Sequence, residues 1–376
     1  MKRDNIRFIS GILIFNLIFS LIGTFCFIYL LLHYNSKKKN NYDLALLCKG
    51  DLDCSSILQK AIDNSASTGV ELYIPPGRYL ITKPLRLKSH VKIRGAGQYV
   101  TSIILAKRNK DNLSHCAFSC DETQNGIKYA GLQGLAIIYE DEPLPEMSGL
   151  YFHKASRCSF SNLVIKNFGT GFRSDLIWMS NLTSVHSVRC LIGFQINRGT
   201  SCYLQNCYAN VCVQGFTLTK LAYSSLQNCA VDHINQGGLR LGDPKFKLSF
   251  AYYFNNCKGI TMTGCGAEHS SGGYLQAKRS VITLVGCRSH NIGTQYNGTK
   301  KQYLLDLPDK SSKLTLIGCS LGNDNSWTKN SNAAVFRVEK GSSIYMLNSK
   351  VSNTAIAKKD VRGQLFDISA NPICSN

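Results

Sequence analysis

Acidic side chains are scarce in this sequence. The 376 residues include 23 Asp and Glu against 43 Lys and Arg, a formal net charge of +20. Only six of the basic residues and one of the acidic residues fall in the first 40 positions, so the remainder still carries +15. Such a surface attracts polyanions. The candidate partners are an acidic polysaccharide or glycan and anionic lipid near the N-terminal apolar run. No nucleic-acid-binding motif occurs, so we expect no nucleic acid.

Helical periodicity is also lacking over most of the chain. Between residues 149 and 290, short stretches alternate apolar and polar residues and are separated by Gly, Asn and Ser. Alternation at period two indicates strands, and no helix of useful length fits between the turns. The 44% hydrophobic and 18% charged residues are those of an ordinary folded protein, which excludes extended disorder beyond a linker and the tail.

A Gly followed by a large apolar residue returns at a fixed interval. The pairs stand 22 residues apart at Gly149, Gly171, Gly193 and Gly215, slip by one at Gly238, and return after an insertion at Gly273. Strands that end in Asn-Cys or Gly-Cys recur in phase with these glycines, and their cysteines are Cys207, Cys229, Cys265, Cys287 and Cys319.

This double register predicts a parallel β-solenoid, in which equivalent side chains of successive coils lie about 4.8 Å apart. The cysteines would form one internal ladder of free thiols. Two pairs outside this phase, Cys48/Cys54 and Cys116/Cys120, are the better disulfide candidates. An antiparallel β-sandwich with regular turns is the alternative, but a sandwich has no reason to keep a 22-residue register.

Residues 8–34 form an apolar run without charge apart from His33. It is long enough to cross a bilayer, exceeds a typical signal-peptide core and lacks a small-residue cleavage site. We therefore expect a cytoplasmic stub and a single transmembrane anchor over 1–34, a linker over 35–47 and a β-helix domain over 48–370. Basic residues flank the run on both sides, so charge leaves the orientation open. We place the β-helix domain outside the cytoplasm.

The start of the folded domain carries a helix signal and two turn signals. Ser or Asp precedes apolar residues at 57, 58, 61 and 62, which predicts a capping helix near 53–66. A strand then leads into the turn Pro75-Pro-Gly-Arg-Tyr79, and a later strand ends in Gly95-Ala-Gly97. The helix would cover the first coil of the solenoid.

This opening resembles the pectate-lyase-like superfamily of right-handed β-helix proteins. The matching residues are Gly50-Asp51, Ile57 to Ile62, Pro75 to Tyr79 and Gly95 to Gly97. The resemblance implies an all-β, right-handed, single-stranded parallel β-helix with an N-terminal capping helix, here preceded by one transmembrane helix. Members include lyases, glycoside hydrolases, epimerases and phage tailspike depolymerases. Polygalacturonase motifs and the clustered Asp of pectate lyases are absent, so neither activity carries over, and we expect no metal and no cofactor.

Candidate catalytic residues follow the cysteine ladder. Strand alternation points the third position after each ladder Cys outward, and the next position lies beside it. Carboxylates one coil apart would suit retaining glycoside hydrolysis, and a His could act as base or bind a substrate carboxylate. The predicted catalytic residues are Asp232, Glu268, His233, His269 and His290. The alternative is a solvated ladder in which these groups pair with one another.

An insertion at 243–256 interrupts the repeat next to this column and is rich in aromatic and basic residues. Solenoids often carry binding surfaces on inserted loops. The alternative is that the insertion forms an extra pair of strands that patches the side of the solenoid. The predicted substrate-binding residues are Asn210, Lys245, Tyr252, Tyr253 and Arg288.

These features together predict a membrane-anchored polysaccharide-active enzyme, a lyase, glycoside hydrolase or epimerase, acting on an acidic glycan and contacting the bilayer through residues 8–34. The alternative is a non-catalytic carbohydrate-binding or structural β-helix protein, for which a homotrimer is possible.

Overall fold

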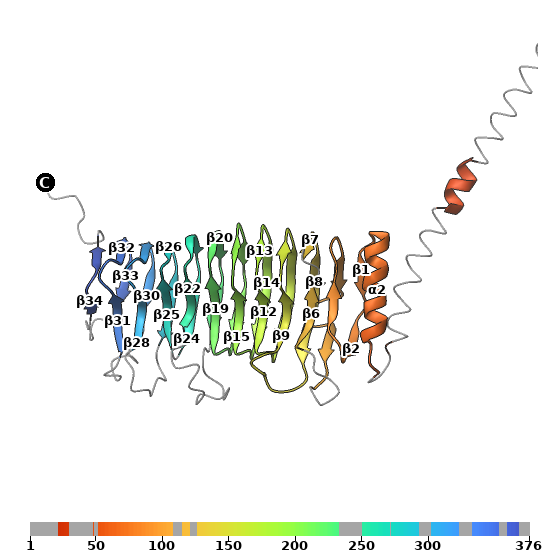
Figure 1. Ribbon diagram of the computed structural model, residues 1–376, viewed down its shortest axis with the longest axis horizontal. Helices are drawn as coiled ribbons and strands as arrows, with labels where there is room; N and C mark the ends of the chain where they lie inside the picture. The colour runs from red at the N-terminus through yellow and green to blue at the C-terminus, as the bar shows by residue number, and fades with distance from the viewer. Residues whose placement is uncertain are drawn as a thin grey trace, which may run out of the picture.

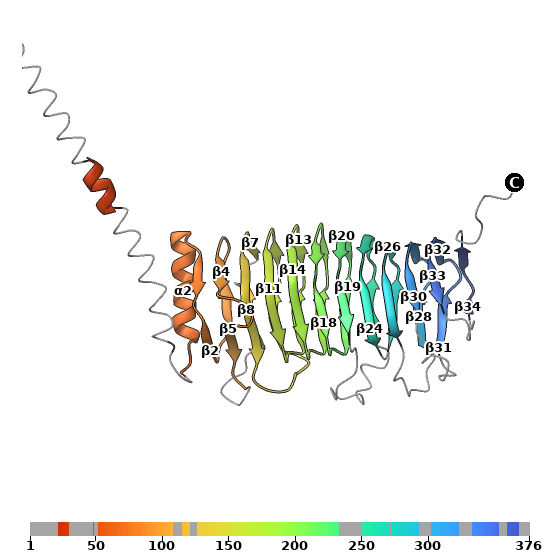
Figure 2. The ribbon, with the colours of Figure 1, turned by 180° about the vertical axis from the view of Figure 1, so that it is seen from behind.

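The computed structural model describes residues 22–29, 48, 52–107, 115–120, 126–232, 250–270, 272–292, 302–322, 333–352 and 359–367. Over these residues the chain winds into a parallel β-helix. Its strands form a 24-stranded and an 11-stranded sheet, and every paired strand runs parallel to its neighbour in the next coil. The coils stack along one long axis (Figure 1, and Figure 2 from behind). The all-β, parallel β-helix prediction is confirmed.

The strands of the 24-stranded sheet are β1 (Leu72–Ile74), β2 (Gly77–Ile81), β4 (Lys92–Gly95), β5 (Thr101–Leu105), β7 (Ile127–Lys128), β8 (Gly131–Tyr139), β10 (Ala155–Ser156), β11 (Ser159–Lys166), β13 (Ile177–Trp178), β14 (Asn181–Val188), β16 (Gly199–Thr200), β17 (Tyr203–Gln205), β18 (Tyr208–Asn210), β20 (Leu221–Gln227), β21 (Ala230–Asp232), β23 (Lys258–Thr263), β24 (Gly266–Ser270), β26 (Val281–Val285), β27 (Arg288–Ile292), β29 (Lys313–Ile317), β30 (Ser320–Gly322), β32 (Ser343–Leu347), β33 (Lys350–Ser352) and β35 (Gln364–Asp367). Those of the 11-stranded sheet are β3 (Leu85–Leu87), β6 (Cys116–Cys120), β9 (Ser148–Phe152), β12 (Thr170–Ser174), β15 (Ile192–Ile196), β19 (Gln214–Thr219), β22 (Phe250–Asn255), β25 (Gly273–Lys278), β28 (Gln302–Leu307), β31 (Ala333–Val338) and β34 (Lys359–Val361).

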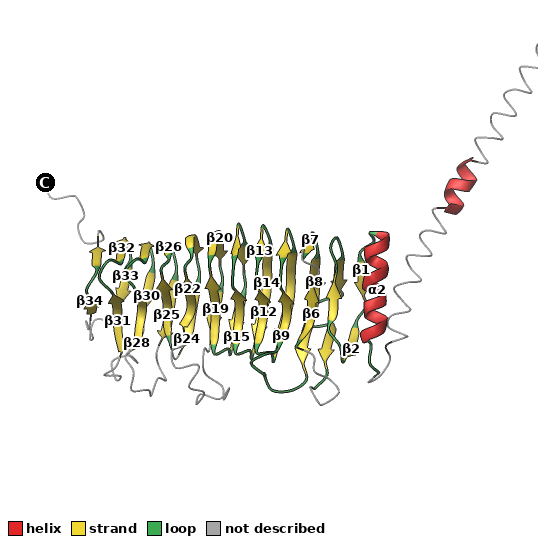
Figure 3. Cartoon of the chain, viewed as in Figure 1, coloured by secondary structure: helices red, strands yellow, loops and turns green. Residues whose placement is uncertain are grey.

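The helix α2 (Ser55–Thr68) covers the N-terminal end of the solenoid, as Figure 3 shows in red. Its apolar face buries Leu58 and Ile62 against the first coil. The Asp53 carboxylate accepts hydrogen bonds from the Ser55 backbone at 2.9 Å and from the Thr82 hydroxyl at 2.6 Å, which ties the start of the helix to the bend directly after β2. The predicted cap near 53–66 is confirmed, two residues later than expected.

The repeated glycines mark places where the 11-stranded sheet closely approaches the opposite wall. A Cβ at Gly149 would lie 2.2 Å from Cγ2 of Ile165, and one at Gly193 would lie 2.8 Å from Cβ of Ala209. The large residue that follows each repeated Gly in the described part of the chain faces the core, where the rings of Phe194 and Phe216 stack at 4.5 Å. The 22-residue register is therefore a packing requirement repeated once per coil.

The cysteine ladder is also confirmed. Each thiol donates to a backbone carbonyl of the preceding coil, at 3.4 Å for Cys207, Cys229, Cys265 and Cys287 and at 3.5 Å for Cys319. The residue before each thiol turns the chain with positive φ, which Asn and Gly adopt at least cost; Asn228 has φ 49° and Gly264 has φ 60°. Cys48, Cys54, Cys116 and Cys120 are free thiols, so neither predicted disulfide is present.

Part of the predicted membrane span belongs to the described chain. Residues 22–29 are helical, and their large apolar side chains are exposed, including Phe25 at 72% and Phe27 at 63%. No helix among the described residues has the length and apolar character needed to cross a membrane. The rest of the span and the linker 35–47 lie outside the described residues.

Candidate functional site

Four residues predicted from the sequence form one outward column on the 24-stranded sheet. Strands β18, β21, β24 and β27 lie in consecutive coils and pair in register, with Asn210 beside Asp232, Asp232 beside Glu268, and Glu268 beside His290. The predicted column is confirmed. Its members have side chains outside the core because the inward neighbours are Ala209, Val231, Ala267 and Ser289.

Asp232 is held by partners from both neighbouring coils. His269 places Nδ1 3.2 Å from one carboxylate oxygen, and the Tyr208 hydroxyl donates to the other at 3.1 Å. Burial, with the Asp232 charge as the next cause, raises the pKa of Tyr208 to about 12, so this phenol stays a proton donor at neutral pH. The Asp232 side chain is 20% exposed. Its orientation is therefore fixed by the surrounding coils.

The backbone conformation of His269 aims its ring at Asp232. Its φ of 45° lies in the left-handed region, which residues with a Cβ adopt infrequently. Val211, which follows Asn210 as His269 follows Glu268, has φ 52°. The turn thus belongs to this corner of the solenoid, and a His placed there faces the neighbouring carboxylate.

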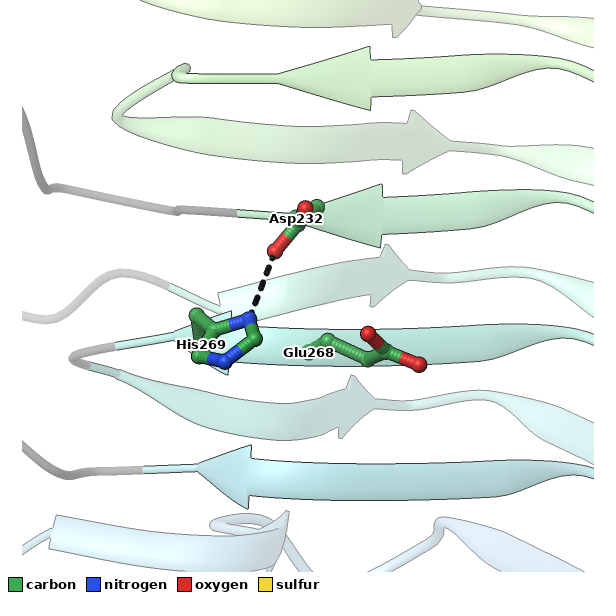
Figure 4. Close-up of side chains that lie close together, drawn as sticks. All are labelled: Asp232, Glu268 and His269. Atoms are coloured by element: carbon green, nitrogen blue, oxygen red, sulfur yellow. Dashed lines mark hydrogen bonds and ion pairs between the residues drawn. The ribbon is translucent and has the colours of Figure 1, made fainter.

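Figure 4 shows Asp232 on one strand, Glu268 and His269 on the next, and the imidazole turned toward Asp232. One ligand atom from each of the three lies within 4.8 Å of the others. That spacing is close to the roughly 5 to 5.5 Å between the carboxyl groups of retaining glycosidases. Two carboxylates and an imidazole are also ligands that a divalent transition metal accepts, a possibility that the sequence reasoning did not include.

A hollow of about 420 Å³ opens beside Glu268. Small residues create it: a Cβ at Gly266 would find no atom closer than 3.7 Å, and Ser320 and Gly322 line the far side. Arg288 and His290 border it, and the His290 ring lies 6.4 Å from that of His269. The hollow thus combines a carboxylate with two side chains able to bind an anionic group.

The other predicted substrate-binding residues fare differently. The prediction that Tyr252 binds substrate is wrong. Tyr252 is fully buried, in register with Phe216, and its hydroxyl donates to the carbonyls of Cys229 at 2.9 Å and Gly266 at 2.8 Å. Alternation along β22 points it into the core. Tyr253 points outward, but it lies on the 11-stranded sheet, and the Lys278 ammonium lies 5.5 Å from its ring centroid.

Asn210 lies in the column, and its buried Oδ1 has no hydrogen-bond partner among the described atoms. Predicted residues His233 and Lys245 lie outside the described residues. Tyr208 was missed by the sequence reasoning. It stands two places before Asn210, so the same alternation that selected Asn210 also points Tyr208 outward.

Comparison with known proteins supports this fold. Residues 42–127 match the model of the family described as "Rhamnogalacturonase A/epimerase, pectate lyase-like". This stretch of the chain is similar to that pectate-lyase-like family, and the chain as a whole has the parallel β-helix fold. That match spans the capping helix and the first coils, where the sequence resemblance was found. No curated protein matches the chain by sequence.

Solved structures share the parallel β-helix fold at low identity. The Acinetobacter phage vb_AbaP_AS12 gp42 tailspike superposes with a TM-score of 0.69 at 17% identity, over 85% of this chain and 60% of that one. The A-module of Azotobacter vinelandii mannuronan C-5 epimerase AlgE4 gives 0.54 at 12% identity, over 86% and 97%. The DFA-IIIase of Arthrobacter chlorophenolicus, without its lid, gives 0.54 at 11% identity, over 83% and 87%. These likenesses establish the fold.

Proposed function

We propose that this protein is a carbohydrate-active enzyme that hydrolyses an acidic polysaccharide with retention of configuration at the hollow beside Glu268. One observation carries the proposal: Asp232 and Glu268 stand in register on adjacent coils, with oxygen atoms within 4.8 Å of each other. Retaining hydrolysis needs two carboxyl groups at this kind of separation, one as nucleophile and one as acid and base.

The surroundings of the two carboxyl groups assign their roles. Asp232 is fixed by Tyr208 and His269, as a nucleophile that must attack along one line should be. Glu268 is exposed and borders the hollow, so it can protonate the leaving glycosidic oxygen. Asp232 would form the glycosyl ester, and Glu268, then ionised, would take a proton from the water that cleaves this ester. Arg288 and His290 would bind the carboxylate of an acidic sugar.

Two other reactions follow from the same family and would leave different products. Elimination would produce an unsaturated sugar, and epimerisation would change a stereocentre without cleavage. The family description and the AlgE4 module name epimerases, so the assay must detect all three outcomes.

A non-catalytic carbohydrate-binding or structural β-helix protein is the second candidate. One observation favours it: Tyr208 and His269 already occupy both Asp232 oxygens, as in a surface ladder whose groups pair with one another. A homotrimer stays a prediction within this alternative.

We further propose that residues 8–34 tether the enzyme to a membrane, with the β-helix domain outside the cytoplasm. The uncharged run and the exposed apolar side chains of residues 22–29 support the tether. Flotation of the full-length protein with liposomes, compared with a chain starting at residue 41, tests the tether; equal flotation of both would refute it.

The activity test incubates the full-length protein with polygalacturonate, alginate, hyaluronan and polysialic acid. New reducing ends without ultraviolet absorbance indicate hydrolysis, reducing ends with absorbance indicate elimination, and changed sugar signals in the proton NMR spectrum without cleavage indicate epimerisation. Binding without products supports the second candidate. Asp232→Asn and Glu268→Gln should each abolish product formation. Glu71→Gln is the matched control, because Glu71 is exposed and pairs only with Arg94 among the described ion pairs.

A further inference from the structure

A second polar cluster, outside the predicted column, lies at the edge of the 11-stranded sheet. Tyr151 of β9, Arg173 of β12 and Gln195 of β15 stand side by side in three consecutive coils. His153, Asp175 and Asn197 lie two places further along the same coils, where the chain leaves the sheet. These six side chains are called the Asp175 cluster below.

Hydrogen bonds converge on the Asp175 carboxylate. The Tyr151 hydroxyl donates to one oxygen at 2.7 Å, and the Asn197 amide donates to the other at 2.8 Å. Nδ1 of His153 lies 3.4 Å from the first oxygen. Asp175 itself is 25% exposed, which leaves it within reach of solvent. The network orients three side chains around one carboxylate.

These contacts also fix the charge state of the cluster. Burial works against ionisation of Asp175, but the hydrogen bonds from Tyr151, Asn197 and His153 outweigh it and lower the pKa of this carboxyl. Burial, followed by the bond to Asp175, raises the pKa of Tyr151 to about 12. At neutral pH the cluster therefore holds a satisfied carboxylate and a neutral phenol.

Arg173 has hydrogen-bonding capacity that the cluster leaves unused. Its Nε is buried and has no hydrogen-bond partner among the described atoms, and the nearest Asp175 oxygen is 3.7 Å away. Its guanidinium carbon lies 4.8 Å from the Tyr151 ring centroid, which holds the group in place. A buried N–H without an acceptor costs about 1 to 3 kcal/mol. The rest of the Arg173 side chain is 34% exposed and open to a ligand.

The Asp175 cluster is distinct from the hollow beside Glu268. Asp232 ends β21, and the chain then enters the 11-stranded sheet at β22, so this is the edge where the parallel strands of that sheet begin. Asp175 follows the end of β12 and lies at the other edge. The five residues of β12 separate the edges by about 17 Å, and two coils add roughly 10 Å along the axis. One sugar unit cannot contact both.

We propose that the Asp175 cluster is a second binding site, for the carboxylate-bearing unit of an acidic polysaccharide. Arg173, whose side chain is 34% exposed although Nε is buried, donates from its terminal guanidinium nitrogens to the ligand carboxylate, in the bidentate geometry that Arg forms with such groups. His153, 73% exposed, contacts the same ligand from the solvent side. A chain bound here would be retained on the β-helix while another segment occupies the hollow, which raises the local concentration of substrate.

Titration calorimetry on the full-length protein in detergent tests the proposal, with galacturonate and mannuronate hexasaccharides as probes. The Glu268→Gln background prevents turnover. Two hexasaccharides should bind per chain, and Arg173→Gln should remove one site or weaken it at least tenfold, about 1.4 kcal/mol. Arg189→Gln is the matched control: it removes the same charge from an exposed Arg paired with Glu142, and both sites should persist.

The same titrations separate this proposal from the hydrolase proposal. Arg288→Gln should remove only the site at the hollow. If Arg173→Gln removes a site and Arg288→Gln removes none, the second site stands and the hollow loses its substrate contact. Unchanged stoichiometry together with unchanged affinities in Arg173→Gln, or no binding of either probe, overturns the second site. Arg173→Lys keeps the charge but loses the two parallel N–H donors of the guanidinium, so its affinity for the hexasaccharide should lie between those of the unmutated site and Arg173→Gln.

A measurement on the unmutated chain covers the case in which the Arg173 variants fail to fold. Diethylpyrocarbonate should modify the exposed His153, and the hexasaccharide should slow that reaction at least severalfold. An unchanged modification rate at saturating hexasaccharide would refute ligand contact at the cluster.

Discussion

Two Gly→Ala substitutions in the same solenoid should have opposite effects on stability. At Gly171 the new methyl would lie 2.3 Å from Ser187 Oγ, 2.7 Å from the Gly193 carbonyl oxygen and 2.9 Å from Ser187 Cβ. Rotating the hydroxyl relieves only the first contact and breaks its 2.9 Å hydrogen bond to the Gly193 carbonyl. At Gly266 the nearest atom is the Arg288 carbonyl oxygen at 3.7 Å, an ordinary contact.

The two magnitudes follow from these distances. Overpacking a dense core costs about 1 to 3 kcal/mol, so Gly171→Ala should lower the free energy of unfolding by roughly that amount. An added methyl in open space reduces the entropy of the unfolded chain, so Gly266→Ala should change the free energy of unfolding by about 0 to +1 kcal/mol. The same methyl projects into the hollow, so Gly266→Ala should reduce activity while the protein stays folded.

Urea unfolding of the full-length protein, followed by far-UV circular dichroism, measures both effects. The slopes of the transitions should be compared first, because a solenoid can unfold in parts. Equal midpoints for the two variants would refute the packing explanation of the 22-residue register. A lower free energy of unfolding in Gly266→Ala would contradict the open space that the structure shows beside Gly266.

Three further predictions follow. Removing divalent cations with EDTA should leave hydrolysis unchanged, because the proposed mechanism uses only side chains; loss of activity that Mn²⁺ or Zn²⁺ restores would instead assign Asp232, Glu268 and His269 as metal ligands. Because the pKa of Asp175 is lowered in the folded protein, its ionised carboxylate stabilises the fold at every pH above its pKa in the unfolded chain, about 3.9. This contribution to stability is lost as the pH falls through the lower pKa of the folded state. Asp175→Asn should therefore destabilise the protein at neutral pH, and its urea midpoint should fall less between neutral and acid pH than that of the unmutated protein. If the urea midpoints of the two proteins fell equally with pH, the result would contradict the network. Burial raises the pKa of Cys202 and of Cys257 to about 11, so these thiols should resist iodoacetamide in the native protein and react after denaturation.

The sequence predicted the fold well because the fold repeats. Each coil imposes the same close approach at Gly149 or Gly193 and the same carbonyl contact at Cys207 or Cys229, so the constraint recurs at a fixed interval. Alternation counted from the ladder also placed Asp232 and Glu268 correctly, because strand geometry fixes which positions face outward. A local periodicity was enough for both conclusions.

Contacts that join different columns could not be predicted in this way. The insertion interrupts the repeat before Tyr252, so the sequence did not show which face of the strand Tyr252 occupies. An aromatic residue of the core was therefore assigned to the surface. The contact of Arg173 with the Tyr151 ring depends on side chains from adjacent coils that turn toward one another at a sheet edge. The hollow depends on small residues, Gly266 and Ser320, which carry no chemical signal of their own. These features emerge only from the three-dimensional packing.

The configuration of the first product tests the central claim most directly. Proton NMR of the anomeric signals, recorded while the full-length protein acts on its acidic polysaccharide, distinguishes the possible reactions before mutarotation mixes the anomers. Catalysis by Asp232 and Glu268 predicts that the new reducing end keeps the anomeric configuration of the cleaved bond, and that Glu268→Gln gives no such signal. An inverted anomer, an unsaturated sugar, or unchanged product formation in Glu268→Gln would contradict it.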